Sequence, residues 1–361
     1  MMDKKIQKQA VGEKLANIRK ILIVRLRSIG DMILIGPAVL ALKKTYPGAE
    51  ITVVSEPLCV PVVAGNPLYD RVIVFSIQRV KTLPFRQMIT EYVKFTAFLR
   101  NKQFDLTIDL HGGPRAAVIT LLSGSRCRLG YELRGRQWAY TISRRVELGN
   151  LMIRTHIELL RSVGTSPLHP PEQGLFFPIP VSHRTWAGDF LRSLPRNDLL
   201  LVFHCGARFD YKCWPDTHFI TLGKKLHLWR KTTIVLIGGK ADEDKSREIA
   251  RAIGVNAVNL AGELPLEKTA ALIEQADLMV CNDSGPMHIA EALHIPIISL
   301  FGPTDPNIWA PVGKRNRVIQ CDDVNPASTG RDGGIAEIPV ETVYQVCLAM
   351  ISEKDGEVTN G

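Results

Sequence analysis

The sequence lacks several features that would place it quickly in a class. It has no uninterrupted apolar run of about 18 residues, so no segment is predicted to span a membrane. Its start, MMDKKIQKQAVGEKLANIRK, is polar and basic and has no apolar signal core, which predicts a cytoplasmic protein. Its 7 cysteines are scattered, odd in number and never spaced Cys-x-x-Cys. This usage is typical of reduced thiols and argues against a disulfide framework or a zinc site.

Two common nucleotide-binding signatures are also missing. The chain has no Gly-x-x-x-x-Gly-Lys-Ser/Thr loop, and no Gly-x-Gly-x-x-Gly follows its first apolar run. These loops supply the backbone N–H groups that hold nucleotide phosphates in Walker ATPases and in standard NAD enzymes. The sequence therefore argues against both classes.

Acidic residues are scarce in the first half of the chain. The net charge is +9, but residues 1–170 hold 26 Lys/Arg against 12 Asp/Glu, which gives +14, and the remainder holds 19 against 24, which gives −5. Such asymmetry favours an anionic partner for the first half, whether nucleic acid, an anionic membrane surface or a phosphorylated substrate. A solvated basic surface without a partner fits the same counts.

What the chain does contain is a regular alternation of strand and helix patterns. Short β-branched runs such as ILIVRL and EITVVS are separated by amphipathic stretches, which predicts parallel sheets with helices on both faces. A length of 361 residues is too long for one ordinary domain. We expect an α/β protein with two doubly wound, Rossmann-like domains that face each other across a cleft. The expected segments are a first domain over 20–170, a proline-rich linker with one short helix over 171–198, a second domain over 199–335 and a C-terminal helix over 336–355.

Polar residues gather where the strands of the second half end. In CNDSGPMHIAEAL, a strand runs into Asp283, Ser284 and Gly285, and a helix is predicted to start near Pro286. The free N–H groups of such a helix end suit a diphosphate, and His288 one turn further on suits a phosphate or a sugar hydroxyl. An ordinary capped helix with a partly buried histidine explains the same residues.

Two further loops follow strands in this half. HCGARFDYKCWP carries Lys212, which could neutralise a departing phosphate, although a solvated lysine is the commoner case. IGGKADED places Glu243 between two aspartates, which superficially resembles a metal-binding Asp-x-Asp motif. Acids in a first helical turn are ordinary partners of the helix dipole, and a carboxylate beyond a strand can also bind ribose hydroxyls.

The first half has its own strand-end cluster. In RLRSIGDMIL, Asp31 follows the first strand and lies at the start of a helix, where it could be an N-cap. Pro37 should kink that helix. DLHGGPRAA ends another strand. The residues expected to form a basic rim here are Arg25, Arg27, His111, Gly112 and Arg115.

In this order, these motifs resemble the lipopolysaccharide heptosyltransferases, the ADP-heptose-dependent glycosyltransferase family 9. The resemblance covers residues 20–350 and runs from ILIVRLRSIGDMILIGPAVLALKKTYPGAEI through DLTIDLHGG, HCGARFDYKCWP and CNDSGPMHIAEAL to FGPTDP and the last helix. The chain departs from the family in segment 321–339, where many relatives carry several cysteines and this chain keeps Cys321 alone.

The resemblance implies a GT-B fold, with the acceptor bound by the first domain and the nucleotide sugar by the second. It implies an inverting transfer of heptose from ADP-heptose to the lipopolysaccharide inner core, without a tightly bound cofactor or metal. It also implies that the final helix returns to the first domain. Asp31 matches the base and Lys212 the lysine at the diphosphate. The other matched donor residues are Glu243 at the ribose and Asp283, Ser284, Gly285 and His288 in the diphosphate-sugar loop.

Some alternatives stay open at this point. Another GT-B sugar-nucleotide transferase or an epimerase would share the fold, and a non-catalytic basic protein would share the charge. The resemblance implies work at the inner face of the cytoplasmic membrane and no nucleic acid partner. The segment VKTLPFRQMITEYVKFTAFLRNK suits that location, because apolar residues lie at near-helical spacing among basic ones. These apolar residues, which could equally pack on the sheet, are Phe85, Met88, Ile89, Tyr92 and Leu99.

Overall fold

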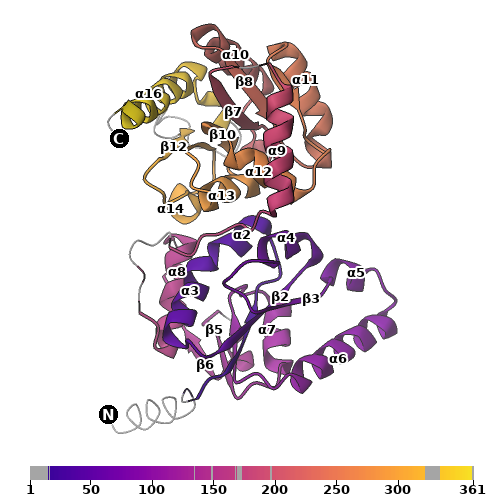
Figure 1. Cartoon of the computed structure of the whole chain (residues 1–361). Coiled ribbons are helices and arrows are strands. Elements are labelled where there is room, and N and C mark those ends of the chain that lie inside the picture. Colours follow the sequence, from indigo (N-terminus) through magenta and orange to yellow (C-terminus); the bar gives the residue numbers. More distant parts are fainter. Residues whose placement is uncertain are drawn as a thin grey trace. The chain divides into compact units, whose positions relative to one another are not determined.

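The computed structural model of the chain is shown in Figure 1. It describes residue 15 and residues 17–359 except 134, 148, 167, 169–172, 196 and 322–333. The chain divides into two compact units, unit 1 over Met1–Pro178 and unit 2 over Ile179–Gly361. Each unit is built on one six-stranded parallel sheet with helices packed on it. The predicted class, α/β with two Rossmann-like doubly wound domains, is confirmed.

The sheet of unit 1 has the strand order β3-β2-β1-β4-β5-β6, and all its neighbouring strands are parallel. Its central strands are buried on both faces, which is why they read as continuous apolar runs and not as alternating patterns. The strands are β1 (Lys20–Val24), β2 (Glu50–Ser55), β3 (Arg71–Val74), β4 (Leu106–Asp109), β5 (Cys127–Tyr131) and β6 (Ile142–Arg144).

The helices of unit 1 are α2 (Ile29–Leu34), α3 (Gly36–Thr45), α4 (Val60–Val63), α5 (Ile77–Lys81), α6 (Phe85–Asn101), α7 (Pro114–Leu122) and α8 (Met152–Leu160). Side chains of α5, α6 and α7 share one core with β1 and β2. A second group is formed by α3, which packs against α8. As Pro37 predicted, the first helix is broken: α2 ends before Ile35 and α3 begins at Gly36.

Unit 2 repeats this arrangement with the strand order β12-β11-β10-β7-β8-β9. Its strands are likewise parallel to their neighbours and buried in the centre of the sheet. The strands are β7 (Leu199–His204), β8 (Thr232–Leu236), β9 (Ala257–Asn259), β10 (Leu278–Asn282), β11 (Ile297–Phe301) and β12 (Asn316–Gln320).

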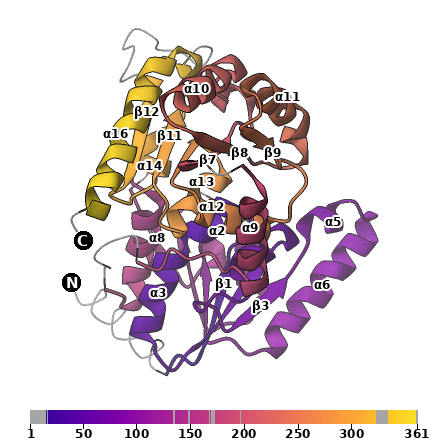
Figure 2. The same ribbon diagram turned by 45° about the horizontal axis from the view of Figure 1, so that its top comes forward.

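The helices of unit 2 are α9 (Val181–Ser193), α10 (Asp216–Trp229), α11 (Glu243–Ile253), α12 (Leu266–Glu274), α13 (Gly285–Ala292), α14 (Pro306–Trp309) and α16 (Val340–Thr359). Figure 2 shows them around the second sheet. Within the expected linker 171–198 lies α9, which packs against α12 and joins it through a two-pronged ion pair between Arg184 and Glu274. Most of that segment therefore belongs to unit 2.

The C-terminal helix was expected to return to the first domain. In the structure, α16 packs against α10 and β11. Its apolar side chains Val343, Cys347 and Ile351 lie in the core of unit 2, because they match the apolar surface left open beside α10. The structure thus assigns this helix to unit 2. Among the described helices, none combines the length and apolar content that crossing a bilayer requires.

The strand orders decide where ligands can bind. In unit 1 the chain reverses its winding direction between β1 and β4, and in unit 2 it does so between β7 and β10. Loops at such a switch point diverge to opposite faces of the sheet and leave a crevice beyond the carboxyl ends of the strands. The predicted base, donor-binding and acceptor-binding residues follow these four strands, apart from Glu243, which follows β8.

Candidate active site

Asp31 lies just beyond the carboxyl end of β1, in the first turn of α2. The N-cap of this helix is Ser28, so the expectation that Asp31 might itself be the N-cap is wrong by three positions. The backbone N–H of Ser28 donates to Asp31 Oδ2 at 2.9 Å, and the Ser28 hydroxyl donates to the same oxygen at 3.0 Å. Asp31 is thus the acidic residue of a capping box. These hydrogen bonds fix its carboxylate, and the Asp31 side chain remains 22% exposed.

The other oxygen of Asp31 pairs with the guanidinium of Arg25. Burial alone would raise the pKa of Asp31, but the Arg25 charge and the Ser28 hydrogen bonds outweigh it and hold the pKa of this carboxyl below its ordinary value. Asp31 is therefore ionised at neutral pH and still reachable from solvent. Those two properties are what a general base needs.

Arg25 differs from its expected place on the basic rim. Its side chain is buried, and it donates to the carbonyl of Leu110 as well as pairing with Asp31. Arg25 is thus a buried cation with two partners inside the unit, and it does not lie on an exposed rim. The sequence RLRS could not separate this arginine from Arg27, since residues two apart in an extended chain point to the same face.

The loop after β4 is shaped by a buried carboxylate. Asp109 Oδ1 accepts the N–H groups of His111 and Gly112, both at 2.8 Å, and Asp109 Oδ2 accepts the hydroxyl of Tyr140 at 2.7 Å. Gly112 has a φ of 69°, in the left-handed region, so glycine is the natural residue there. Gly112 thus shapes the loop and presents its neighbours, and its own carbonyl accepts from Arg136 at 2.6 Å.

Three of the predicted acceptor residues do come together. Arg27, His111 and Arg115 line one pocket of about 220 Å³ within unit 1. Lys81 adds a third full positive charge, whereas Glu56 is the one acid among the described lining residues. The remaining described lining residues are Leu26, Ile77, Gln78, Gly113 and Pro114. Burial lowers the pKa of His111 to about 4, so the imidazole is neutral at pH 7. The excess of cations suits an anionic ligand.

One buried residue of unit 1 was missed by the sequence reading. His156 in α8 is fully buried, its Nδ1 is hydrogen-bonded to the Tyr131 hydroxyl, and its Nε2 has no partner among the described residues. Burial lowers its pKa to about 3, helped by the charge of Arg25. A histidine inside the apolar pattern MIRTHIELL gives no signal in one sequence that it lies near the Arg25–Asp31 pair.

The predicted donor residues other than Glu243 lie at the switch point of unit 2. Ser284 is the N-cap of α13 and Gly285 its first residue, as predicted within one position. In the part of the chain that the structure describes, the N–H groups of Ser284 and Gly285 have no protein acceptor, whereas the N–H of Met287 donates back to Ser284. Asp283 pairs with Lys212 at 2.7 Å. At 20% side-chain exposure, Lys212 is not the free surface lysine considered above.

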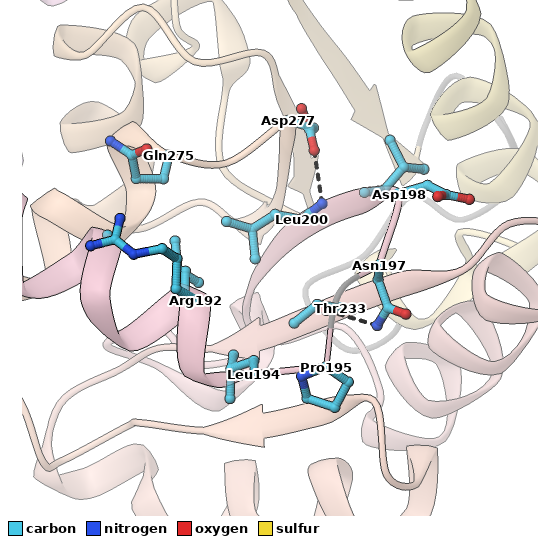
Figure 3. Close-up of a pocket in the computed structure, with 12 residues that line it drawn as sticks. Arg192, Leu194, Pro195, Asn197, Asp198, Leu200, Thr233, Gln275 and Asp277 are labelled. Carbon is cyan, nitrogen blue, oxygen red and sulfur yellow. Dashed lines mark hydrogen bonds between the residues drawn. The ribbon is translucent and has the colours of Figure 1, made fainter.

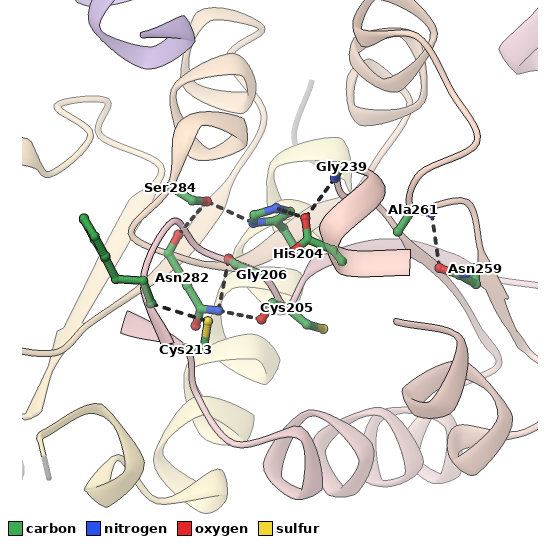
Figure 4. Close-up of polar contacts among 11 residues, drawn as sticks. His204, Cys205, Gly206, Cys213, Gly239, Asn259, Ala261, Asn282 and Ser284 are labelled. Atoms are coloured by element: carbon green, nitrogen blue, oxygen red, sulfur yellow. Dashed lines mark hydrogen bonds and ion pairs between the residues drawn. The ribbon is translucent and has the colours of Figure 1, made fainter. Parts of the chain in front are cut away.

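Three polar side chains hold these donor loops together, and the sequence analysis gave none of them this role (Figure 4). Asn282 donates to the Cys205 carbonyl at 3.0 Å and accepts the N–H of Trp214 at 3.1 Å. His204 Nδ1 lies 2.9 Å from Ser284 Oγ, and its Nε2 lies 3.9 Å from Asp242. They stand in the quoted motifs, but only the pairing of β7 with both β10 and β8 shows that they meet.

Asp242 is the third of these residues, and its carboxylate is held by its own loop. Its carboxylate accepts the N–H of Gly239 at 2.8 Å and lies against Gly206, where a Cβ would come within 2.0 Å of Oδ1. Glu243, the expected ribose ligand, pairs with Lys240 and Arg247. Within the described residues, no three His, Cys, Asp or Glu side chains form a group that could hold a metal ion.

His288 is more buried than its expected role suggested. It is 5% exposed, and its Nδ1 lies 3.2 Å from the buried carboxylate of Glu291. Glu291 in turn accepts the N–H of Val312 at 2.5 Å, so the ring is fixed in orientation. A ligand of unit 2 can therefore be offered only the Nε2 of this histidine.

A separate pocket of about 580 Å³ lies elsewhere in unit 2 (Figure 3). It is lined by Arg192 and Asn197 before β7, Thr233 near the start of β8, and Gln275 and Asp277 before β10. This is the amino-terminal edge of the sheet, away from the switch-point loops. None of the described residues that line it is a predicted site residue.

Two Rossmann-like units, each with charged residues at its switch point, are the architecture of the GT-B glycosyltransferases. A family model, glycosyltransferase family 9 (heptosyltransferase), matches residues 92–332, and the chain belongs to that family. Lipopolysaccharide heptosyltransferase 3 of Escherichia coli is 28% identical over 82% of this chain and 86% of that protein. Lipopolysaccharide heptosyltransferase 2 of Salmonella typhimurium is 28% identical over 83% of this chain and 88% of that protein.

Solved structures agree on the fold. The ADP-heptose lipopolysaccharide heptosyltransferase II of Escherichia coli is 25% identical, with a TM-score of 0.77 over 93% of this chain and 99% of that one. A family 9 glycosyltransferase of Veillonella parvula has a TM-score of 0.81 at 23% identity, over 93% of this chain and 97% of that one. The predicted family and enzyme class are confirmed.

Proposed function

We propose that this chain transfers heptose from ADP-heptose to a sugar of the lipopolysaccharide inner core. The curated relatives with these names support the substrates, and one observation of the chain itself carries the chemistry. Each unit presents at its switch point the charged group that one half of a glycosyl transfer needs. In unit 1 this group is the ionised Asp31, and in unit 2 it is Lys212 beside the start of α13.

Asp31 acts as the general base in this proposal. Its carboxylate takes the proton of the acceptor hydroxyl while that oxygen attacks the anomeric carbon of heptose from the face opposite ADP. The bond between the anomeric carbon and the diphosphate oxygen breaks, and its electron pair leaves with ADP. The new bond has the inverted configuration, and Asp31 is left protonated beside Arg25 until the proton passes to water.

Unit 2 stabilises the leaving group. Lys212 and the N–H groups of Ser284 and Gly285 face the negative charge that grows on the diphosphate. Asp283 keeps Lys212 in place, and Glu243 would bind the ribose by exchanging part of its pairing with Lys240 for sugar hydroxyls. The proposal includes no tightly bound cofactor and no metal ion. Transfer should therefore persist in the presence of a metal chelator.

Unit 1 binds the acceptor through its cationic pocket. Arg27, Lys81 and Arg115 offer three positive charges to the acidic sugars or phosphates of the inner core, and Gln78 offers an amide. Because that acceptor is part of a lipid-anchored molecule, we also propose that the enzyme works at the inner face of the cytoplasmic membrane, without a nucleic acid partner.

A donor and acceptor screen tests this function. Purified full-length chain is given ADP-heptose together with defined truncated cores that end in Kdo, in one heptose or in a longer branch, and products are identified by mass spectrometry. We expect transfer to one of these acceptors and a rise in melting temperature with ADP but not with UDP. A shift with UDP-sugars alone would point to another GT-B transferase or an epimerase and would overturn the donor assignment.

A further inference from the structure

The long helix α6 of unit 1 is apolar on two sides, and the fold needs only one of them. Phe95 and Leu99 lie in the core shared with β1 and β2, and Met88 and Tyr92 pack against it. The ring of Phe75 stacks on that of Phe95 with their centroids 3.9 Å apart. These side chains join α6 to its unit, so two of the five apolar residues noted in the sequence remain to be explained.

Those two, Phe85 and Ile89, continue with Val93 into a stripe on the outer surface of the helix. Their exposed fractions are 70%, 45% and 60%. Successive positions four residues apart lie above one another on a helix, so the three form one line over its first turns. In Figures 1 and 2, α6 lies at the edge of unit 1 beyond β3. Large apolar side chains left together in solvent mark a surface that binds something.

Positive charge surrounds this stripe. Segment 79–102 contains six Lys or Arg residues and a single acid, Glu91. That acid is already bound by Arg79 at 2.9 Å, and Lys94 lies 3.9 Å from it. Arg86 is exposed on α6 between Phe85 and Ile89, with no acidic partner among the described residues. An apolar line flanked by an excess of cations over acids is complementary to a bilayer, which is apolar inside and can carry anionic head groups outside.

We propose that this face of α6 docks the enzyme on an anionic lipid bilayer, with Phe85, Ile89 and Val93 entering the interface and Arg86 and Lys94 lying at the head groups. This is the side-chain pattern of helices that lie in the plane of a membrane surface. A bilayer is favoured over an acidic protein because the proposed acceptor is anchored in one, and to that extent the inference rests on the proposed function.

Vesicle binding by the full-length chain tests the proposal. Binding to phosphatidylcholine vesicles with and without phosphatidylglycerol is measured by sedimentation for the wild type and for the triple variant Phe85→Ser, Ile89→Ser, Val93→Ser. A second variant, Arg86→Gln with Lys94→Gln, removes charge alone. The matched control, Leu228→Ser with Val255→Ser, removes apolar side chains that are 86% and 92% exposed in unit 2. Melting temperatures verify folding, and Val93→Ser alone serves as a milder test.

The wild type should bind the anionic vesicles, and both α6 variants should lose about tenfold or more in partition coefficient while the control does not. All variants should still transfer heptose to a water-soluble, deacylated core at the wild-type rate. Unchanged vesicle binding by the triple variant overturns the proposal, as does a wild-type dimer that this variant abolishes. If no variant or wild type transfers heptose to the soluble acceptor, it is the proposed function that fails, independently of vesicle binding.

Discussion

The two units share one sheet topology and use opposite charges at the same place in it. Read in matching directions, the orders are β3-β2-β1-β4-β5-β6 and β9-β8-β7-β10-β11-β12. After the first strand of unit 1 comes a negative charge, the carboxylate of Asp31, which pairs with Arg25 from the same loop. After the first strand of unit 2 comes a positive charge, the ammonium group of Lys212, which pairs with Asp283 from the loop after the fourth strand. The sheet determines where a site lies, and the loop residues determine its chemistry.

The largest expected effect comes from removing the negative charge of unit 1. Asparagine keeps the size of Asp31, and its amide oxygen can still accept from Ser28, but it loses the ion pair with Arg25. Asp31→Asn should therefore fold, with a lower melting temperature, and should bind ADP as tightly as the wild type. Because the amide cannot accept the proton, single-turnover transfer at saturating donor and acceptor should fall by about 10²–10⁴-fold. A rate within a few-fold of the wild type would leave Asp31 only its part in the capping box.

The next largest effect is expected from removing the positive charge of unit 2. Lys212→Ala removes the charge that we propose faces the leaving diphosphate, and it leaves Asp283 without this partner. The transfer rate should fall by about 10²–10³-fold, and ADP-heptose binding should weaken with it. Lys212→Arg should recover part of both, since the charge remains but its geometry differs. Calorimetry with ADP and the acceptor separately should show lost donor affinity and unchanged acceptor affinity. The reverse result would contradict the assignment of the donor to unit 2.

How far the sequence predicted these sites depends on whether a residue acts through its own loop. The positions of Asp31, Lys212 and the start of α13 could be predicted, because strand ends and helix starts leave a local signal in one sequence. Arg25 was predicted on an exposed rim but is buried, since nothing local shows that its side chain turns under the carboxylate. His156 and His204 were not recognised, because their partners come from distant segments that only the folded sheet brings together.

The smallest expected effect is the contribution of these two histidines, one in each unit, to the loss of stability at acidic pH. Burial lowers the pKa of His156 to about 3 and that of His204 to about 4, whereas an unfolded histidine titrates near 6.5. Between these values only the unfolded chain takes up the proton. Stability is therefore complete above about pH 6.5 and falls as the pH is lowered toward 4, by about 1.4 kcal/mol per pH unit for each histidine.

The variants His156→Asn and His204→Asn test this pH dependence in unit 1 and unit 2, respectively. Each variant removes one titrating imidazole, so the melting temperature of the unit that carries the substitution should depend less on pH between 6.5 and 4. Asp31 gives no such slope in this range, since its lowered carboxyl pKa places its own loss of stability at more acidic pH. A slope that neither variant alters would show that other groups control acid sensitivity.

The described lining of the cationic pocket runs from Leu26 to Arg115 and comes from unit 1 alone. Residues that would choose the acceptor, such as Arg27 and Lys81, are thus separate in sequence from those that would choose the donor. A lineage can change the first set by point substitutions without disturbing the second. Descendants of one ancestral enzyme could in this way come to extend different positions of a growing glycan while drawing on the same activated sugar.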